Sequence, residues 1–188
     1  MRTTLPFNSG WLYAPEVLED HMPDNRFEAI PLPHTNVVLP HNHFHDREYQ
    51  FISTYRKRFR LPEARAGRRV YLEFEGAMMA AMVRLNGHSF GEHRGGYTPF
   101  AYDITDYLHD DGDNLLTVHL DSSERPDIPP CGGRIDYLTY GGIYREVTLR
   151  YVEPVHIKDV FVKAHGLLHN DERVELAITV RNQTNDAQ

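Results

Sequence analysis

The alternation of apolar and polar residues in short segments is the feature that most constrains the fold. In residues 70–74, 116–120 and 147–151, every second side chain is apolar. A period of two places these side chains on one face of a strand, so each segment is predicted to be a half-buried β-strand. The side chains expected in the core are Val70, Leu72, Phe74, Leu116, Val118 and Leu120. No segment of any length shows convincing helical periodicity, and the pattern therefore predicts an antiparallel β-sandwich.

A hairpin and a glycine-rich loop follow the apolar segment 78–85. The segment runs into Asn86-Gly87, which favours a type I′ turn because both central residues need a positive φ. A short return strand is predicted through Phe90, and the loop after it carries glycines and aromatic anchors such as Tyr97. Loops on a rigid scaffold often carry function. A purely structural loop, packed down by its own aromatic side chains, is the alternative that this pattern alone favours.

Three blocks of residues, taken together, resemble a known enzyme family. They lie in the family's order and span most of residues 7–150. The blocks are residues 10–11 with 32–34 and 55–59, residues 85–87 with 91–105, and residues 136–147. This arrangement is similar to the N-terminal domain of glycoside hydrolase family 2, which includes β-galactosidases, β-glucuronidases and β-mannosidases. The resemblance implies that residues 1–152 form a sugar-binding jelly-roll sandwich of the galactose-binding-like type.

A second pattern begins at Glu153-Pro154. Residues 155–162 read as one strand, and the alternation in residues 174–180 predicts another. Two strands are too few to bury a core. The resemblance implies that an immunoglobulin-like sandwich starts here, so residues 153–188 are expected to be the truncated beginning of that domain. Because unpaired strand edges recruit other chains, these strands are expected to be mobile or to self-associate with a neighbouring copy.

Charge and composition argue against several classes of partner. The chain of 188 residues carries 20 basic and 27 acidic residues, a net charge of −7, which leaves no basic face for nucleic acid or an anionic membrane. No apolar run approaches the ~20 residues of a membrane span. The N-terminal residues lack the apolar region of a signal peptide, and the single Cys131 excludes an internal disulfide. These features predict a cytoplasmic protein without a nucleic-acid or membrane partner.

No catalytic residue is predicted. A retaining glycosidase needs two carboxyl groups about 5–5.5 Å apart, and the resemblance implies that they sit on a (β/α)₈ barrel of roughly 250 residues. Nothing in the sequence matches the family's catalytic glutamates, so the chain alone is expected to be inactive and to need no cofactor. Its expected partners are a β-glycoside and the remaining domains of a hydrolase, whose active site its loops would help to wall. The alternative is a free-standing carbohydrate-binding or adhesion module.

Two other features each have a functional and a structural interpretation. His41, His43 and His45 alternate, and on a strand they would share one face as a metal site. No cysteine or ordered acid spacing supports such a site, so no metal is predicted. Trp11 is interpreted as a core side chain, with stacking on a sugar ring as the alternative.

Asp136 is the main candidate for binding the sugar. In β-glucuronidase-like relatives an aspartate at this offset before the Gly-Ile-x-Arg block reaches a hydroxyl of the bound sugar, so the resemblance implies this role. A carboxylate accepts two hydroxyls at once, through bonds roughly twice as strong as neutral ones. The alternative is a loop aspartate that caps its own turn. Secondary candidates on the same rim are His34, Asn36, His93 and Arg94. The glycine-rich loop lacks the substrate-facing acid of some β-galactosidases, which weakens a specific assignment to galactose.

Overall fold

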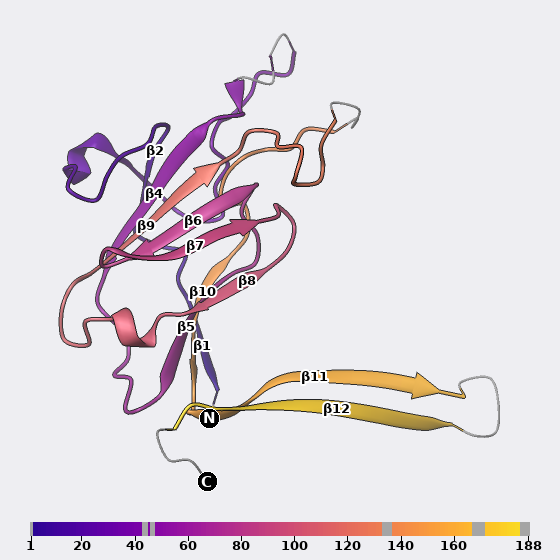
Figure 1. Cartoon of the computed structure of the whole chain (residues 1–188). Coiled ribbons are helices and arrows are strands. Elements are labelled where there is room, and N and C mark those ends of the chain that lie inside the picture. Colours follow the sequence, from indigo (N-terminus) through magenta and orange to yellow (C-terminus); the bar gives the residue numbers. More distant parts are fainter. Residues whose placement is uncertain (1, 43–44, 46–47, 133–136, 167–171, 185–188) are drawn as a thin grey trace.

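The computed structural model is all-β, with a two-sheet sandwich and a projecting hairpin (Figure 1). The structure describes residues 2–42, 45, 48–132, 137–166 and 172–184. The strands are β1 (Thr3–Pro6), β2 (Trp11–Ala14), β3 (Glu28–Ile30), β4 (Ile52–Phe59), β5 (Arg69–Phe74), β6 (Ala80–Leu85), β7 (His88–Arg94), β8 (Phe100–Asp103), β9 (Asn114–Asp121), β10 (Val147–Val152), β11 (Val155–His165) and β12 (Arg173–Asn182). Two short 3₁₀ turns, η1 (Asp24–Arg26) and η3 (Thr105–Tyr107), lie in connections.

The sandwich consists of two antiparallel sheets. One has the strand order β1-β10-β5-β8 and the other the order β3-β2-β4-β9-β6-β7. From β4 to β10 the chain passes repeatedly from one sheet to the other, apart from the β6–β7 hairpin, and such crossing connections are typical of a jelly roll. The predicted antiparallel sandwich is confirmed. In the part of the chain that the structure describes, no helix is long and apolar enough to cross a membrane.

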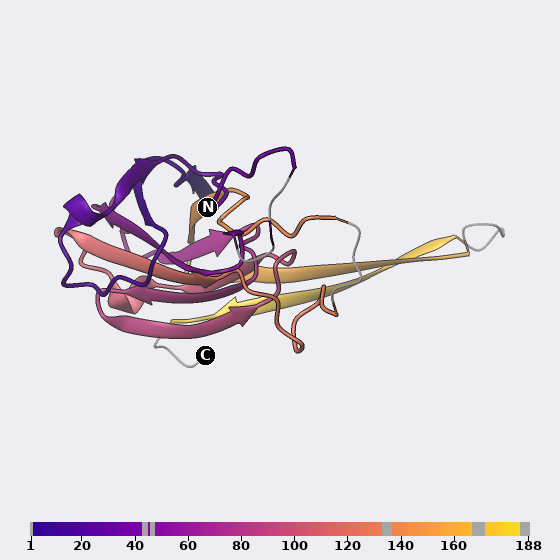
Figure 2. The same ribbon diagram turned by 90° about the horizontal axis from the view of Figure 1, so that it is seen from above.

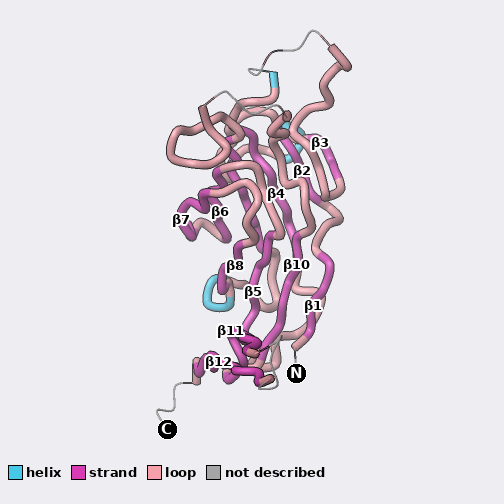
Figure 3. The backbone as a smooth tube through the Cα atoms, turned by 90° about the vertical axis from the view of Figure 1, so that its right-hand side faces the viewer, coloured by secondary structure: helices cyan, strands magenta, loops and turns pink. Residues whose placement is uncertain are grey.

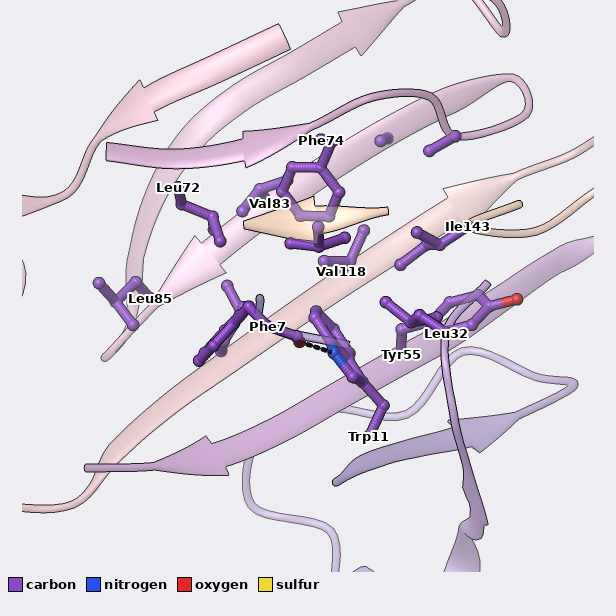
Figure 4. Packing of buried hydrophobic residues seen from close by; sticks show 14 of the residues in the cluster. Phe7, Trp11, Leu32, Tyr55, Leu72, Phe74, Val83, Leu85, Val118 and Ile143 are labelled. Carbon is purple, nitrogen blue, oxygen red and sulfur yellow. Dashed lines mark hydrogen bonds between the residues drawn. The ribbon is translucent and has the colours of Figure 1, made fainter. Parts of the chain in front are cut away.

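The core lies between the inner faces of the two sheets (Figure 4). All six side chains that the alternation predicted to be buried have no exposed surface. Trp11 is also fully buried, and its Nε1 donates a hydrogen bond to the carbonyl oxygen of Phe7 at 2.8 Å. The interpretation of Trp11 as a core side chain is therefore confirmed, because a ring without exposed surface cannot stack on a ligand.

The Asn86-Gly87 hairpin has the predicted backbone, with φ values of +51° and +83°. Its return strand is longer than predicted, since β7 continues past Phe90 to Arg94. A bulge opposite β6 absorbs Gly91, whose φ is +86°, and the pairing then resumes. Glycine tolerates this left-handed conformation, so what reads as a strand terminator in the sequence lies inside the strand.

One of the two arginines in β4, Arg56, is not exposed. Arg56 has no exposed surface because the connection between β2 and β3 covers it. Its guanidinium donates to the carbonyl oxygens of Met22 and Glu19 at 2.6 and 2.7 Å and to Asp24 Oδ1 at 2.9 Å. Alternation alone does not predict this burial, because the covering segment has no regular periodicity.

Strands β11 and β12 pair with each other and extend away from the sandwich (Figures 1 and 2). Both predicted strands are thus present, although the turn predicted around residue 171 falls largely outside the described residues. Large apolar side chains on both strands are exposed, among them Phe161 at 63% and Val174 at 66%. The hairpin meets the sandwich beside β5 (Figure 3), where the Tyr71 hydroxyl lies 3.0 Å from Gln183 Oε1 and 3.1 Å from Arg181.

Candidate functional site

Four loops meet at one end of the sandwich, because β5, β7 and β9 end there and β4 begins there (Figure 1). We call them the loop rim, and their described residues are 31–42, 45, 48–51, 75–79, 95–99, 122–132 and 137–146. Backbone hydrogen bonds join them: His34 donates to Ile143 at 2.9 Å, Met78 to Gly142 at 3.0 Å, and Gly95 to Met79 at 3.0 Å. Segments far apart in the sequence therefore form one surface.

Gly141 and Gly142 allow two of these loops to touch. Gly142 has a φ of +125°, and a Cβ on it would press against the backbone of His34 and Asn36. A Cβ on Gly141 would overlap the Ser122 hydroxyl and the Asn36 amide. Any side chain at either position would push the loops apart. The two glycines therefore serve this close approach between the loops.

Two predicted site residues, His34 and Asn36, lie together inside the rim. His34 is half-buried, with Nδ1 2.9 Å from the Tyr55 hydroxyl, and burial lowers the pKa of this imidazole. Asn36 is buried and donates from Nδ2 to the Tyr49 carbonyl at 2.8 Å. Its Oδ1 is buried with no hydrogen-bond partner among the described residues. The first contact ties His34 to β4, and the second ties Asn36 to Tyr49 within the same loop.

His93 and Arg94 lie on another part of the rim, at the end of β7. The His93 ring stacks on Phe100 with 4.0 Å between centroids, and its Nε2 is 3.1 Å from the Gly95 carbonyl oxygen. Arg94 forms ion pairs with Glu92 at 2.6 Å and with Asp127 at 3.2 Å. His34 and Asn36 therefore lie in one part of the rim, and His93 and Arg94 make their contacts in another.

An exposed network of alternating charges joins β7 to the loop after β9. Arg125 pairs with Glu92 at 2.8 Å and with Asp127 at 3.0 Å, and Arg94 pairs with the same two carboxylates. Hydrogen bonds from Arg94 and Arg125 lower the pKa of the Glu92 carboxyl. Because each carboxylate already has two cationic partners, neither resembles a general acid, which needs a raised pKa.

Two predictions about this end of the molecule concern residues outside the described ranges. One is the prediction that Asp136 binds the sugar. The other concerns His43, and among the residues that the structure does describe, no group of three or more His, Cys, Asp or Glu side chains could hold a metal ion.

An uncharged pocket of about 220 Å³ opens between the loops. We call it the rim pocket, and its lining residues are Thr35, Met78, Tyr97, Leu138, Thr139, Tyr140 and Tyr144. Tyr97 and Tyr140 are 43% and 42% exposed, and the Tyr144 hydroxyl donates to the Gly96 carbonyl oxygen at 2.5 Å. Burial, with a contribution from Tyr137, raises the pKa of Tyr97 to about 12, so this hydroxyl is neutral near pH 7.

Sequence reasoning identified only Tyr97 among these residues, as a loop anchor. The available signal was the density of tyrosines between residues 137 and 144, next to two glycines. Exposed aromatic rings in glycine-containing loops are a feature of many binding surfaces.

A larger hollow of about 630 Å³ lies at the opposite end, beside the base of the β11–β12 hairpin. Arg65 and Arg69 line it, but each is paired with an aspartate: Arg65 with Asp110, and Arg69 with Asp106 at 3.0 Å. The charges of this hollow are internally balanced, and it also includes Pro154 at the joint with the hairpin. We interpret it as part of that joint.

Comparisons with known proteins agree with this arrangement. The model of the glycosyl hydrolases family 2 sugar binding domain matches residues 15–154. A β-galactosidase of Thermoanaerobacter pseudethanolicus is 44% identical over 183 residues, which cover 95% of this chain and 24% of the relative. A β-glucuronidase of Formosa agariphila is 34% identical over 173 residues, which cover 83% of this chain and 18% of the relative.

Solved structures share the fold. A calcium binding mutant of Bacteroides uniformis β-glucuronidase 2 is 27% identical, with a TM-score of 0.86, over 98% of this chain and 23% of that chain. The chain of another solved structure, a crystal structure of Bacteroides uniformis β-glucuronidase, is 26% identical, with a TM-score of 0.80, over 94% of this chain and 22% of that chain. The chain spans about a quarter of the length of the first curated relatives that it matches.

Proposed function

This chain belongs to glycosyl hydrolase family 2, and from that membership we propose that it is the non-catalytic sugar-binding domain of an enzyme that hydrolyses terminal β-glycosides. The family match over residues 15–154 is the observation that carries the proposal. The loop rim supports it, because a cluster of loops at one end of a rigid sandwich suits a wall of a binding site. The relatives named as β-galactosidase and β-glucuronidase define the range of sugars to test.

Catalysis itself is assigned to the rest of the protein. Hydrolysis with retention needs two carboxyl groups about 5–5.5 Å apart across the glycosidic bond. The Glu92–Arg94–Asp127–Arg125 network has its carboxylates occupied by arginines. We therefore propose that a separate (β/α)₈ barrel supplies the acid and the nucleophile, and that the loop rim helps to enclose the sugar beside it.

Asp136 remains our candidate for the sugar contact from this domain. It precedes the segment that supplies Leu138, Tyr140 and Tyr144 to the rim pocket, which supports a position close to the ligand. A carboxylate there would accept two sugar hydroxyls through charge-assisted hydrogen bonds. His34, Asn36, His93 and Arg94 are proposed to act mainly by holding the rim, given the protein contacts that they already make.

We also propose that residues 153–188 begin a second, immunoglobulin-like sandwich, with the boundary after residue 152. The exposed apolar side chains of β11 and β12 support this, because such faces normally pack against a second sheet. When that partner is absent, we expect the hairpin to self-associate, since exposed strand edges and apolar faces recruit other chains. Concentration-dependent sedimentation of residues 1–188 would test this, and a strictly monomeric chain would contradict it.

The decisive experiment compares the full-length protein with residues 1–188 on a panel of 4-nitrophenyl β-glycosides: galactoside, glucuronide and mannoside. We expect the full-length protein to hydrolyse at least one of them and residues 1–188 to hydrolyse none. Turnover by pure residues 1–188 would overturn the non-catalytic assignment. Lack of turnover by the full-length protein, together with retained sugar binding, would favour the free-standing carbohydrate-binding module instead.

The role of Asp136 is tested in the full-length enzyme with Asp136→Asn, which keeps the shape and removes the charge. We expect a strong loss of kcat/KM at an unchanged melting temperature. Asp111→Asn, an exposed aspartate of the β8–β9 connection, is the matched control and should keep wild-type activity. Activity of Asp136→Asn that is unchanged, or that falls only in step with stability, would reduce Asp136 to a turn residue.

A further inference from the structure

The rim pocket has the size and the lining of a site for one apolar ring. Its volume of about 220 Å³ is somewhat larger than the ~150 Å³ cavity that accommodates benzene in an engineered protein core. A single six-membered ring therefore fits, whereas a chain of sugar rings does not. The lining is aromatic or aliphatic apart from two threonines, and none of these side chains carries a charge near pH 7.

The walls of the pocket are fixed before any ligand arrives. The Tyr144 hydroxyl is hydrogen-bonded to Gly96, and the backbone of Met78 is bonded in both directions to Gly142, at 3.0 and 3.4 Å. Met78 is only 2% exposed, and a Cβ on Gly96 would overlap its sulfur, so the base of the pocket is closely packed. A preformed pocket binds with a smaller entropic cost than one that must order its loops.

The chemistry of the lining selects the occupant. An anionic group is disfavoured because no lining side chain carries a positive charge to compensate for its lost hydration. A pyranose ring directs hydroxyls outward all around its edge, and a buried hydroxyl without a partner costs free energy. An aryl ring has no such requirement, and the exposed rings of Tyr97 and Tyr140 offer it edge or stacked contacts.

We propose that the rim pocket binds the apolar aryl leaving group, the aglycone, of a β-glycoside while the sugar is held in the adjoining active site. This inference rests on the proposed function, because an aglycone is defined by the bond that the full-length enzyme cleaves. In this arrangement the domain contributes to the choice of leaving group, in addition to any contact that it makes with the sugar. The aryl group enters with its glycosidic oxygen directed out of the pocket, toward the catalytic domain.

The test uses the full-length enzyme and two substrates with the same sugar, a 4-nitrophenyl and a methyl β-glycoside. The measured quantity is the ratio of their kcat/KM values, relative to the same ratio in the wild-type enzyme, so that the intrinsic reactivity of the leaving groups cancels. Tyr97→Ala and Tyr140→Ala should each lower this ratio by about 3- to 10-fold, the effect expected for loss of one aromatic contact. Tyr97→Phe and Tyr140→Phe, which keep the rings, should leave the ratio near the wild-type value.

Tyr107→Ala is the matched control, because Tyr107 is 37% exposed but lies in η3, at the opposite end of the sandwich. It should keep the wild-type ratio. Both pocket tyrosines are more than 40% exposed, so their truncation is compatible with folding, and melting temperatures verify this. An unchanged ratio in both alanine variants of an enzyme that cleaves both substrates would overturn the aglycone site and leave the proposed function standing. An enzyme that cleaves neither glycoside would overturn both.

Discussion

The sandwich and the β11–β12 hairpin carry the same alternating pattern but differ in what covers it. Val70, Leu72 and Phe74 on β5 have no exposed surface, whereas Leu176 and Ile178 on β12 are 57% and 54% exposed. Burial of such a side chain contributes about 1.5–3 kcal/mol. The difference shows that a period of two specifies which side chains share a face, while burial depends on a second layer. The hairpin is regular structure without that layer.

The largest expected effect is a direct test of this contrast by truncation. In residues 1–188, Leu72→Ala should lower the free energy of unfolding by roughly 2–5 kcal/mol, because it removes buried methyl groups and leaves a cavity. At a protein concentration at which the chain is monomeric, Leu176→Ala should change it by less than about 0.5 kcal/mol. Urea unfolding measures both. A loss in Leu176→Ala as large as that in Leu72→Ala would show that the hairpin is covered in solution.

The second test concerns the loop rim, where backbone rather than side chains is closely packed. Gly142→Ala should destabilise the chain by roughly 2–4 kcal/mol, because it combines an unfavourable φ of +125° with overlap against the loop of residues 31–51. Gly67→Ala is the matched control, since its φ is +79° but its Cβ would meet open space. It should cost about 1–2 kcal/mol. If both variants lose the same free energy of unfolding, backbone strain alone accounts for the loss in Gly142→Ala. Contact between the loops would then contribute nothing.

The third test measures how much a buried polar side chain, Arg56, contributes to the free energy of unfolding. Arg56→Ala removes three hydrogen bonds of a fully buried guanidinium and should cost about 2–3 kcal/mol. It should also raise the hydrogen-exchange rate in the connection between β2 and β3. Arg60→Ala, just past the end of the same strand and largely exposed, should have no measurable effect on unfolding. Similar behaviour of both variants would contradict the burial of Arg56.

The smallest effect is expected at the joint between the two regions. Burial by itself would raise the pKa of the Asp103 carboxyl, but hydrogen bonds from Thr105, Gln183 and Arg69 outweigh it and lower the pKa. A depressed pKa in the folded state stabilises the fold above the usual value of 3.8, and this contribution is lost as pH falls through the folded pKa. Unfolding of residues 1–188 should therefore become easier below about pH 4.

Asp103→Asn isolates the contribution of this joint, because it removes the titrating group and keeps the shape. Its unfolding free energy should depend less steeply on pH below about pH 4 than that of the wild type. Asp111→Asn serves again as the control and should keep the wild-type slope. If the slope is the same in all three proteins, Asp103 does not couple protonation to the joint.

The sequence predicted the strands and the core well, but it predicted the candidate site only in outline. The alternation around Leu72 and Val118 identifies core side chains because it is a local pattern. The rim pocket depends on contacts among Thr35, Met78 and Tyr144, which are brought together by crossing connections and carry no local periodicity. Burial of Arg56 was missed for the same reason, since an irregular segment covers it. The resemblance to the family singled out residues 136–147 as a block, and Leu138, Thr139, Tyr140 and Tyr144 of that block line the pocket.

The backbone bonds that join the rim loops also constrain how this end of the molecule can change. Because Gly142 is bonded to Met78 and lies against the loop of residues 31–51, lengthening any one loop at these points displaces the others. We therefore expect insertions to be tolerated at the loop tips rather than in the bonded segments. With the proposed role of the rim pocket, leaving-group preference would be transferred between two relatives by grafting the loops as one set. Substitution of the outward-facing tyrosines is the alternative that leaves the framework intact.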